Sequence, residues 1–334
     1  MNKYSIILPV RNGGEYVKIC VNSILSQTLD DFNLILLDNC STDGTVEWIR
    51  SLNDNRIIIH SSTRSLSIEE SWGRIKDIEK NEFITLIGHD DILYPDFLQT
   101  IDDLIVTYPG AGLYQTHFNF IDAHGKKIRA SQAMKATYTG TDFLKAFLTS
   151  TIDLMGTGYV MRSKDYDELG GIPVKYPNLL FADFELWTML AGKSFFAVDA
   201  KNCFAFRIHQ STTNKSPDQQ LHTAFRLFVD FLVGLKEKDE KLQGVIHESG
   251  GQFLLHYCNA YAHRMLRSSI KNRNGITIER FIEQTRIMAD KLGITSSYHP
   301  EKKSSLQLAR RIDDSSALRY LFLLFKKIYS KPIF

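Results

Sequence analysis

The stretch from Thr85 to Asp96, TLIGHDDILYPD, decides how the rest of the chain is interpreted. In it an apolar run ends at Gly88, and His89, Asp90 and Asp91 follow at once. A short apolar run ended by turn residues is typical of a buried parallel strand, and parallel sheets place ligands beyond the carboxyl ends of their strands. Two adjacent carboxylates there repel each other unless Mg²⁺ or Mn²⁺ lies between them and an anionic ligand. Alternatively, Asp91 caps the next segment and Asp90 lies in a solvated turn.

Strand and helix patterns alternate on the amino-terminal side of this stretch. The apolar runs that predict strands lie at residues 4–10, 32–37, 56–60 and 83–87, and a helical pattern follows each of the first three. The third helix begins with the capping-box spacing of Ser67 and Glu70. This alternation predicts an α/β fold, with a Rossmann-like, mostly parallel sheet flanked by helices.

The pattern changes towards the carboxyl end. Short strands are predicted at 111–118, 195–198 and 203–208, and helices at 217–237, 240–270, 277–292 and 315–330. No strand pattern remains after Pro217, so we predict a catalytic domain at 1–216 and a helical carboxyl-terminal region at 217–334.

Composition excludes several classes of protein. The 334 residues carry a formal charge of only +2, which argues against nucleic acid as a partner. The four cysteines show no Cys-x-x-Cys spacing, so neither a zinc site nor a disulfide framework is predicted. No basic leader precedes the first strand, and no uncharged apolar window reaches the ~20 residues that a membrane span needs. We therefore expect a cytoplasmic protein.

Polar residues at the ends of the first two strands predict a nucleotide site. Asp38 follows the second strand, and Pro9, Arg11 and Asn12 end the first. In a parallel sheet these ends meet at one edge, where we expect contacts with base and ribose while Asp90 holds a metal against a diphosphate. Neither Gly-x-Gly-x-x-Gly nor Gly-Lys-Ser/Thr is present, so a metal bridge remains the way to neutralise the diphosphate.

Five motifs in this order carry a resemblance. They are PVRN, LLDNCSTDGT, LIGHDDIL, DFELW and FRIHQST, within residues 3–213. Together they resemble family 2 of the inverting glycosyltransferases, which have a GT-A fold and, in bacteria, build polysaccharide and O-antigen. The resemblance implies transfer of a sugar from a nucleoside diphosphate, with UDP favoured, to the hydroxyl of a glycan or lipid-linked acceptor. It also implies dependence on a divalent metal, Mn²⁺ or Mg²⁺.

The resemblance implies roles for single residues. Asp38 would bind the nucleoside, Asp90 would be the metal-binding end of the DxD-type motif, and Asp183 would be the general base. Further candidates are Asp91 and His209 at the metal, Arg207 at the diphosphate, and Gly156 and Thr157 on the acceptor side. The chemistry agrees, since a single displacement needs one base for the attacking hydroxyl and one cation for the departing diphosphate.

The chain departs from the family pattern at two positions. Gly88 stands where many members have the first aspartate of DxD, which leaves that contact to His89 or to water. Ala182 stands where the glutamate of the family's Glu-Asp pair is usual, and a slipped register would make Glu185 the base. These departures favour one alternative, a nucleotide-sugar-binding protein without catalysis. A sugar nucleotidyltransferase is the other alternative.

The last twenty residues, 315–334, form an amphipathic pattern with basic residues beside an apolar face. Such a helix can lie among the headgroups of a membrane, here the cytoplasmic face of the inner membrane, or it can cover the catalytic domain or a sister subunit. A peripheral membrane contact would suit a lipid-linked acceptor.

Overall fold

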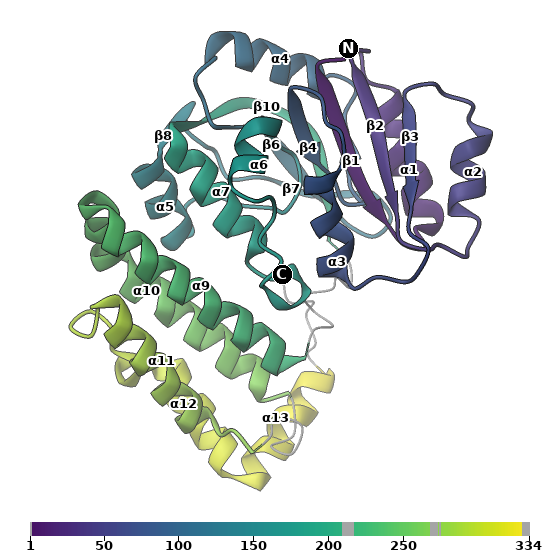
Figure 1. The fold of residues 1–334 in the computed structure, drawn as a ribbon. Coiled ribbons are helices and arrows are strands. Elements are labelled where there is room, and N and C mark those ends of the chain that lie inside the picture. The colour runs from purple at the N-terminus through teal and green to yellow at the C-terminus, as the bar shows by residue number, and fades with distance from the viewer. Residues whose placement is uncertain (1, 209–216, 268–272, 274, 329–334) are drawn as a thin grey trace. The chain divides into compact units, whose positions relative to one another are not determined.

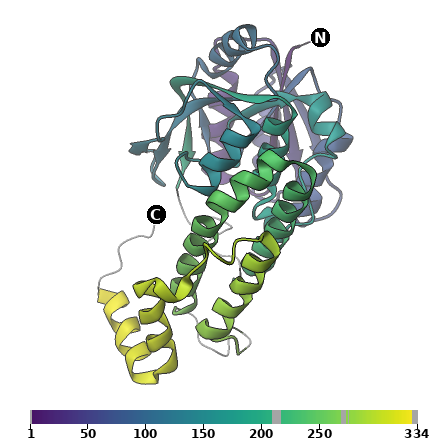
Figure 2. The same cartoon turned by 90° about the vertical axis from the view of Figure 1, so that its left-hand side faces the viewer.

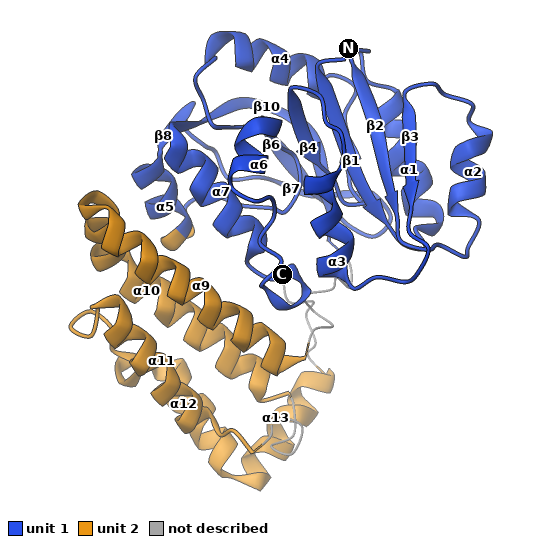
Figure 3. Cartoon of the chain, viewed as in Figure 1, with its two compact units in different colours: residues 1–147, 151–216 blue, residues 148–150, 217–334 orange. Residues whose placement is uncertain are grey.

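The computed structural model describes residues 2–208, 217–267, 273 and 275–328. The chain divides into two compact units, of which unit 1 comprises residues 1–147 and 151–216, and unit 2 residues 148–150 and 217–334 (Figure 3). Each unit is described by itself.

Unit 1 is built on one sheet whose strand order is β3-β2-β1-β4-β9-β6-β10-β5, with β7 beside β6 and β8 beside β10 (Figure 1). The strands are β1 (Tyr4–Val10), β2 (Phe32–Asp38), β3 (Ile57–Ser61), β4 (Phe83–Leu86), β5 (Ile92–Leu93), β6 (Leu113–Ile121), β7 (Lys127–Ala130), β8 (Thr137–Thr139), β9 (Tyr159–Arg162) and β10 (Phe195–Arg207). β3, β2, β1 and β4 are parallel to one another. The rest of the sheet is mixed, because β9 runs antiparallel to both β4 and β6.

Helices cover both faces of this sheet. Before residue 217 they are α1 (Gly14–Leu25), α2 (Thr45–Ser51), α3 (Ile68–Gly73), α4 (Phe97–Thr107), α5 (Gly140–Leu148), α6 (Ser163–Glu168) and α7 (Ala182–Lys193). Val160 belongs to the apolar core that α1 and α4 share with the sheet. Its neighbour Tyr159 stacks on Trp187 of α7 at 4.4 Å between ring centroids. Because successive side chains of a strand point to opposite faces, α7 lies opposite α1 and α4.

The α/β prediction is therefore confirmed, and two details differ. Residues 195–207 form one strand with irregular pairing near Asp199 and Asn202, where two strands are predicted. The expected helix from Ser67 does begin with its capping box, in which the side chains of Ser67 and Glu70 each accept the other residue's backbone N–H. It continues after Gly73 only as a short 3₁₀ turn, Arg74–Asp77.

Unit 2 is helical. Its helices are α9 (Asp218–Lys238), α10 (Glu240–Met265), α11 (Ile278–Leu292), α12 (Ser304–Asp314) and α13 (Ser316–Ile328). The prediction lacks α12, which packs beside α13; the two form the yellow pair in Figure 2. A buried ion pair between Arg273 and Asp313, 2.6 Å from Nη2 to Oδ1, ties the loop before α11 to the end of α12. No helix in the described ranges combines the length and apolar content that crossing a bilayer requires.

Candidate active site

The ends of β1 and β2 form the nucleoside side of the candidate site. Val10 pairs with Asp38 in the parallel register, and both side chains are buried. The Asp38 carboxylate accepts a hydrogen bond of 3.0 Å from the backbone N–H of Ser41, which shapes the turn after β2. Pro9 is buried within β1, whereas Arg11, two residues further, is exposed. Asp38 therefore ends β2 and Arg11 directly follows β1, its neighbour in the sheet.

Asn12 joins the two loops that follow these strands. Its backbone has a left-handed φ of 51°, which asparagine tolerates better than most residues. Its N–H donates to the Ser41 hydroxyl at 3.0 Å, and its side-chain oxygen accepts from the Thr42 N–H at 2.8 Å. These reciprocal bonds make Asn12 a positioning residue for the loop.

Two polar residues near Asp38 have no role in the sequence-based prediction. The Asn39 side chain exchanges two hydrogen bonds with the backbone of Leu66, at 3.0 and 2.7 Å, and so fixes the loop after β3. The Arg74 guanidinium donates to the main-chain oxygen of Asp38 at 3.1 Å. Their sequence neighbourhood gives no sign of these contacts, because the partners are 27 and 36 residues away.

The loop after β4 that contains His89, Asp90 and Asp91, here called the acidic loop, is fixed in place by the buried side chain of Asp91. This carboxylate is 2% exposed and accepts bonds from the Thr157 hydroxyl at 2.6 Å and from the Arg207 backbone N–H at 2.9 Å. Burial, and secondly the charge of Asp90, raise the pKa of Asp91. Asp91 therefore connects three segments of unit 1, and its role at a metal stays a prediction.

Asp90 and Gly88 share one small space. Asp90 and His89 are half-buried. A Cβ built on Gly88 would lie 2.7 Å from the Asp90 Oδ1, so this carboxylate occupies the room that a side chain at 88 would need. Within the described residues, no group of three or more His, Cys, Asp or Glu side chains could hold a metal. Asp90 alone nevertheless fits Mg²⁺-type binding, in which one or two carboxylates act together with substrate phosphates.

Arg207 lies at the end of β10 and is 3% exposed. Its Nε donates to the main-chain oxygen of Asp90 at 2.8 Å, and its Nη1 donates to those of Asp122 and Ala123 at 3.1 and 3.2 Å. The guanidinium also lies 4.7 Å from the centre of the Tyr16 ring. Through these contacts Arg207 fixes the acidic loop, and its contact with a diphosphate stays a prediction. His209 lies outside the described residues.

Asp183 lies in the first turn of α7 and is half-buried. Its Oδ1 accepts a bond of 3.0 Å from the Phe184 N–H, and its Oδ2 would be 3.2 Å from a Cβ at Gly156. Burial raises the pKa of Asp183 to about 6, although the Phe184 N–H acts in the opposite direction. A carboxylate with such a pKa is mostly ionised at neutral pH, yet more basic than a free aspartate.

The segment from Gly156 to Gly158 joins this carboxylate to the acidic loop. Gly156 faces Asp183, and the next residue, Thr157, binds Asp91. Gly158 has a φ of 80°, and a Cβ there would lie 2.5 Å from the Phe204 ring, so only glycine fits. Through two adjacent residues, Gly156 and Thr157, this short segment contacts both the candidate base and the acidic loop.

Glu185, the alternative base, is already engaged. Its Oε1 accepts from Lys175 at 2.9 Å, and its Oε2 accepts from the Tyr176 hydroxyl. Both of its carboxylate oxygens are thus occupied by donors from the protein, which leaves neither directed at an acceptor hydroxyl. The geometry therefore favours Asp183 over Glu185.

The backbone that leads into α7 is strained. Asn178, Leu179 and Phe181 have φ values of 54°, 55° and 73°. Leucine and phenylalanine rarely occupy this left-handed region, at a cost of roughly 1–2 kcal/mol per residue. Such strain persists only where the surrounding structure imposes it, and it is common beside functional sites.

Comparisons with known proteins identify the family of the amino-terminal domain. A model of the family described as "Glycosyl transferase family 2" matches residues 5–170. The glycosyltransferase GlyG of Streptococcus pneumoniae is 27% identical over 124 residues, covering 36% of this chain and 41% of that protein. YibD of Escherichia coli K12, an uncharacterized glycosyltransferase, is 24% identical over 160 residues, covering 45% of each chain. The matched parts therefore span less than half of these relatives.

Solved structures share the fold at low sequence identity. TarS residues 1–349 of S. aureus, in complex with UDP-GlcNAc, superposes with a TM-score of 0.67 at 14% identity, covering 97% of this chain and 92% of that one. The mannosyltransferase PcManGT from Pyrobaculum calidifontis, in complex with GDP-Man and Mn²⁺, gives 0.53 at 12% identity and covers 93% and 87%. The fold is that of GT-A glycosyltransferases, and residues 5–170 of this chain form a glycosyl transferase family 2 domain.

Proposed function

We propose that this chain transfers a sugar, with inversion at the anomeric carbon, from a nucleoside diphosphate sugar to an acceptor hydroxyl. Asp183 removes the proton of the attacking hydroxyl as the new glycosidic bond forms and the bond to the diphosphate breaks. The observation that carries the proposal is the segment 156–158, which contacts Asp183 through Gly156 and Asp91 through Thr157. This segment fixes the spacing between the base and the loop proposed to meet the diphosphate.

The donor side is proposed to include Asp38 at the nucleoside, with Pro9, Arg11 and Asn12 in the adjoining loop and His89 near the ribose. Asp90 would hold a divalent cation, which would neutralise the departing diphosphate. A UDP-sugar is the favoured donor, since the structure of TarS, which shares this fold, contains UDP-GlcNAc. Mn²⁺ or Mg²⁺ is favoured because PcManGT was solved with Mn²⁺.

A screen of nucleotide sugars tests this proposal. Purified protein is heated with each member of a panel of UDP-, GDP- and dTDP-sugars, with and without Mn²⁺, and release of free diphosphate is followed in parallel. We expect one nucleotide to raise the melting temperature only when Mn²⁺ is present, together with slow hydrolysis. Stabilisation without any hydrolysis or transfer would favour the binding-protein alternative, and no stabilisation by any donor would contradict the proposal.

A substitution at Gly88 tests the proposed role of Asp90 by displacing its carboxylate without removing it. In a Gly88→Ala variant the new Cβ would lie 2.7 Å from the Asp90 Oδ1, so the carboxylate must move. We expect kcat/KM for the donor to fall about tenfold, which corresponds to ~1.4 kcal/mol. Gly192→Ala is the matched control, since a Cβ there meets nothing within 4 Å. Equal activity of the two variants would mean that the Asp90 position does not matter.

The carboxyl-terminal helix α13 is proposed to contact a membrane surface, where a lipid-linked acceptor would be found. None of its residues is buried within the structure, and two basic residues, Lys326 and Lys327, lie in its last turn. Large apolar side chains on it are exposed, with Tyr320, Leu321 and Ile328 at 64, 58 and 74%. Apolar surface beside basic residues suits anionic headgroups. A cytoplasmic location, on the inner face of that membrane, is part of this proposal.

Vesicle sedimentation tests the membrane proposal on the full chain. We expect vesicles with one fifth anionic lipid to retain the wild type and to lose most of a Leu321→Glu, Ile328→Glu variant, because each glutamate repels the headgroups and removes apolar area. Leu308→Glu on the neighbouring helix α12 is the control, since Leu308 is similarly exposed at 56%. If all three proteins sediment alike, α13 does not anchor the chain, and a role in pairing subunits becomes the one to test.

A further inference from the structure

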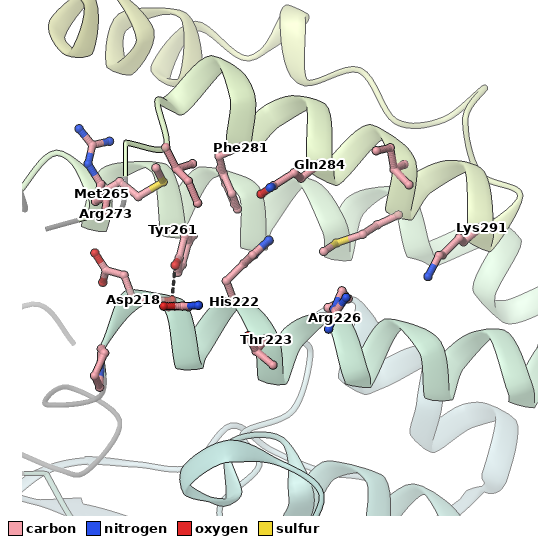
Figure 4. Close-up of a pocket in the computed structure, with 15 residues that line it drawn as sticks. Asp218, His222, Thr223, Arg226, Tyr261, Met265, Arg273, Phe281, Gln284 and Lys291 are labelled. Carbon is pink, nitrogen blue, oxygen red and sulfur yellow. Dashed lines mark hydrogen bonds between the residues drawn. The ribbon is translucent and has the colours of Figure 1, made fainter. Parts of the chain in front are cut away.

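Unit 2 contains a cavity of about 640 Å³ between α9, α10 and α11 (Figure 4). All of its lining residues belong to unit 2, so it is distinct from the candidate active site, which is built from unit 1. Its volume falls within the range of sites that hold small organic ligands, roughly 300–1,000 Å³. The side chains that line it indicate what kind of ligand it would take.

Aromatic rings form the middle of this cavity. Tyr261 and Phe281 pack at 4.7 Å between ring centroids, and His222 lies 5.6 and 5.2 Å from them. The Tyr261 hydroxyl is turned away towards the main-chain oxygen of Asp218, to which it donates. Burial lowers the pKa of His222, a hydrogen bond with the Gln284 side chain opposes this in part, and the charge of Arg226 adds to the lowering. The middle of the cavity is therefore an uncharged, largely apolar surface at neutral pH.

Flexible aliphatic side chains extend this apolar surface. Met265 and Met288 are buried at 2 and 4% exposure, and Ile276 and Ile287 complete the lining. Methionine adapts to irregular apolar shapes more easily than branched residues do. The cavity can thus accept an apolar chain or ring without a rigid fit.

The charged side chains around the cavity differ in whether an opposite charge is paired with them. Arg273 is paired with buried Asp313, and Asp218 with Arg264 at 2.7 Å. Lys291 has only an exposed partner, Asp230, at 2.8 Å, and such exposed pairs contribute little. Arg226 is exposed and forms no ion pair with any residue that the structure describes. Figure 4 shows Arg226 and Lys291 at the same end of the cavity, which leaves that end positively charged.

One buried polar atom of Arg273 in the lining lacks a partner. Its Nε donates no hydrogen bond to any residue that the structure describes, whereas the Gln284 side chain interacts with His222. Arg273 as a whole is only 5% exposed. Buried polar atoms are nearly always satisfied, so each unpartnered atom calls for a water or a ligand. Arg273 lines this cavity, so its Nε is available to a ligand there.

We propose that this cavity binds an amphipathic anion, with its apolar part along the aromatic and methionine surface and its phosphate or carboxylate group at Arg226 and Lys291. A guanidinium pairs well with either anion through two N–H groups. The inference goes beyond the proposed sugar transfer, since none of the residues assigned to that reaction lines the cavity. Failure of one proposal therefore leaves the other standing.

Calorimetry with three probes tests the ligand class on the full chain. Dodecyl phosphate below its micellar concentration carries both features, dodecyl maltoside carries only the apolar chain, and inorganic phosphate carries only the charge. We expect dodecyl phosphate to bind at least tenfold more tightly than either of the others, with a stoichiometry of about one. Equal binding of dodecyl maltoside would show a non-specific apolar surface, and equal binding of phosphate would show a surface anion site; either result would overturn the proposal.

Two variants locate the site. Arg226→Glu places a negative charge at the anionic end and should weaken dodecyl phosphate about tenfold or more. Arg280→Glu, on the exposed surface of α11 and outside the cavity, is the matched control and should stay within about twofold. Thr223→Trp fills part of the cavity without changing charge and should also weaken binding. Melting curves confirm folding of each variant. Equal affinity of the Arg226 and Arg280 variants would refute the assignment.

Vesicles distinguish a lipid from a free amphiphile. The same variants are sedimented with phosphatidylcholine vesicles that contain phosphatidic acid. If Arg226→Glu weakens both dodecyl phosphate and vesicle binding, the cavity takes its ligand from a bilayer. If it weakens only the soluble probe, the ligand is a free amphiphile. If it weakens neither, the cavity does not bind amphipathic anions.

Discussion

The Asp183→Asn variant is expected to lose sugar transfer by about 10²–10⁴-fold in kcat, the usual contribution of a general base. Asparagine keeps the size of the side chain and can still accept the bond from the Phe184 N–H, but it cannot take the proton of an acceptor hydroxyl. Binding of the donor should be unchanged, since Asp183 faces Gly156 and not the residues proposed for the nucleotide. Initial rates with the donor found in the screen, together with donor-induced thermal shifts, check both statements.

The pH dependence gives this prediction a second readout. The pKa of Asp183 is raised to about 6, so wild-type kcat should rise with pH up to about 6 and then level off. Since the native pKa lies above that of a free aspartate, this group contributes stability below about pH 4 that is lost as pH rises through about 6. The Asp183→Asn variant should therefore be more stable than the wild type at pH 8, by roughly 1–3 kcal/mol, and about equal to it at pH 4.

Glu185→Gln is the control for the position of the base. Glu185 is held by Lys175 and Tyr176, so this variant should lose some stability but keep its rate within a few-fold and keep the acidic limb of the pH profile. If instead the limb disappears in Glu185→Gln and remains in Asp183→Asn, the base lies one helical turn further along α7. An Asp183→Asn variant with wild-type kcat would refute the assignment directly.

The second large effect is expected for Asp90→Ala. Loss of the one half-buried carboxylate of the acidic loop should lower transfer by about 10²-fold or more, since a cation that stabilises the leaving diphosphate contributes several kcal/mol. Stabilisation of the protein by Mn²⁺ together with the donor should also vanish. This result would distinguish the two variants, because stabilisation by Mn²⁺ and the donor should persist in Asp183→Asn.

Asp96→Ala serves as the matched control for Asp90. Asp96 directly precedes α4, where its side chain forms no cap hydrogen bond, and it pairs with exposed Lys201 at 2.5 Å, so its loss should change transfer by less than about twofold. A shift of the Mn²⁺ dependence in Asp90→Ala without loss of rate would show that Asp90 tunes metal affinity only. Full activity of Asp90→Ala, with an unchanged response to Mn²⁺, would remove the metal role altogether.

The parallel half of the sheet could be predicted because its information is local. The β1, β2 and β4 strands are mostly apolar and largely buried on both faces, and glycine or polar residues end these runs. The mixed half of the sheet could not be predicted from the sequence. The β9 strand has four residues and pairs antiparallel with two partners that are distant in sequence. The α12 helix was missed because only Leu306, Ala309 and Asp313 are buried, too few to form an apolar stripe.

The candidate site divides in the same way. Residues at strand ends, such as Asp38 and Asp90, can be found from patterns, since turn chemistry follows an apolar run. The contacts that fix these residues in position cannot be found from such patterns. Arg207 binds three main-chain oxygens from Asp90, Asp122 and Ala123, and a carbonyl group leaves no mark on the sequence. The burial of Asp91 depends likewise on Thr157, 66 residues away.

The left-handed residues before α7 bear on when the site forms. In an unfolded chain Leu179 and Phe181 prefer other backbone conformations, so nothing local prepares the turn that places Asp183. The turn must be imposed from outside, for example by the Glu69 carboxylate that accepts the Asn178 N–H across 109 residues of sequence. Contacts of such separation are made late, after the closure of a long loop has been offset by other packing. The base is therefore placed late in folding, and so is the acidic loop, which Arg207 holds across 116 residues of sequence, so a partly folded chain lacks both parts of the site.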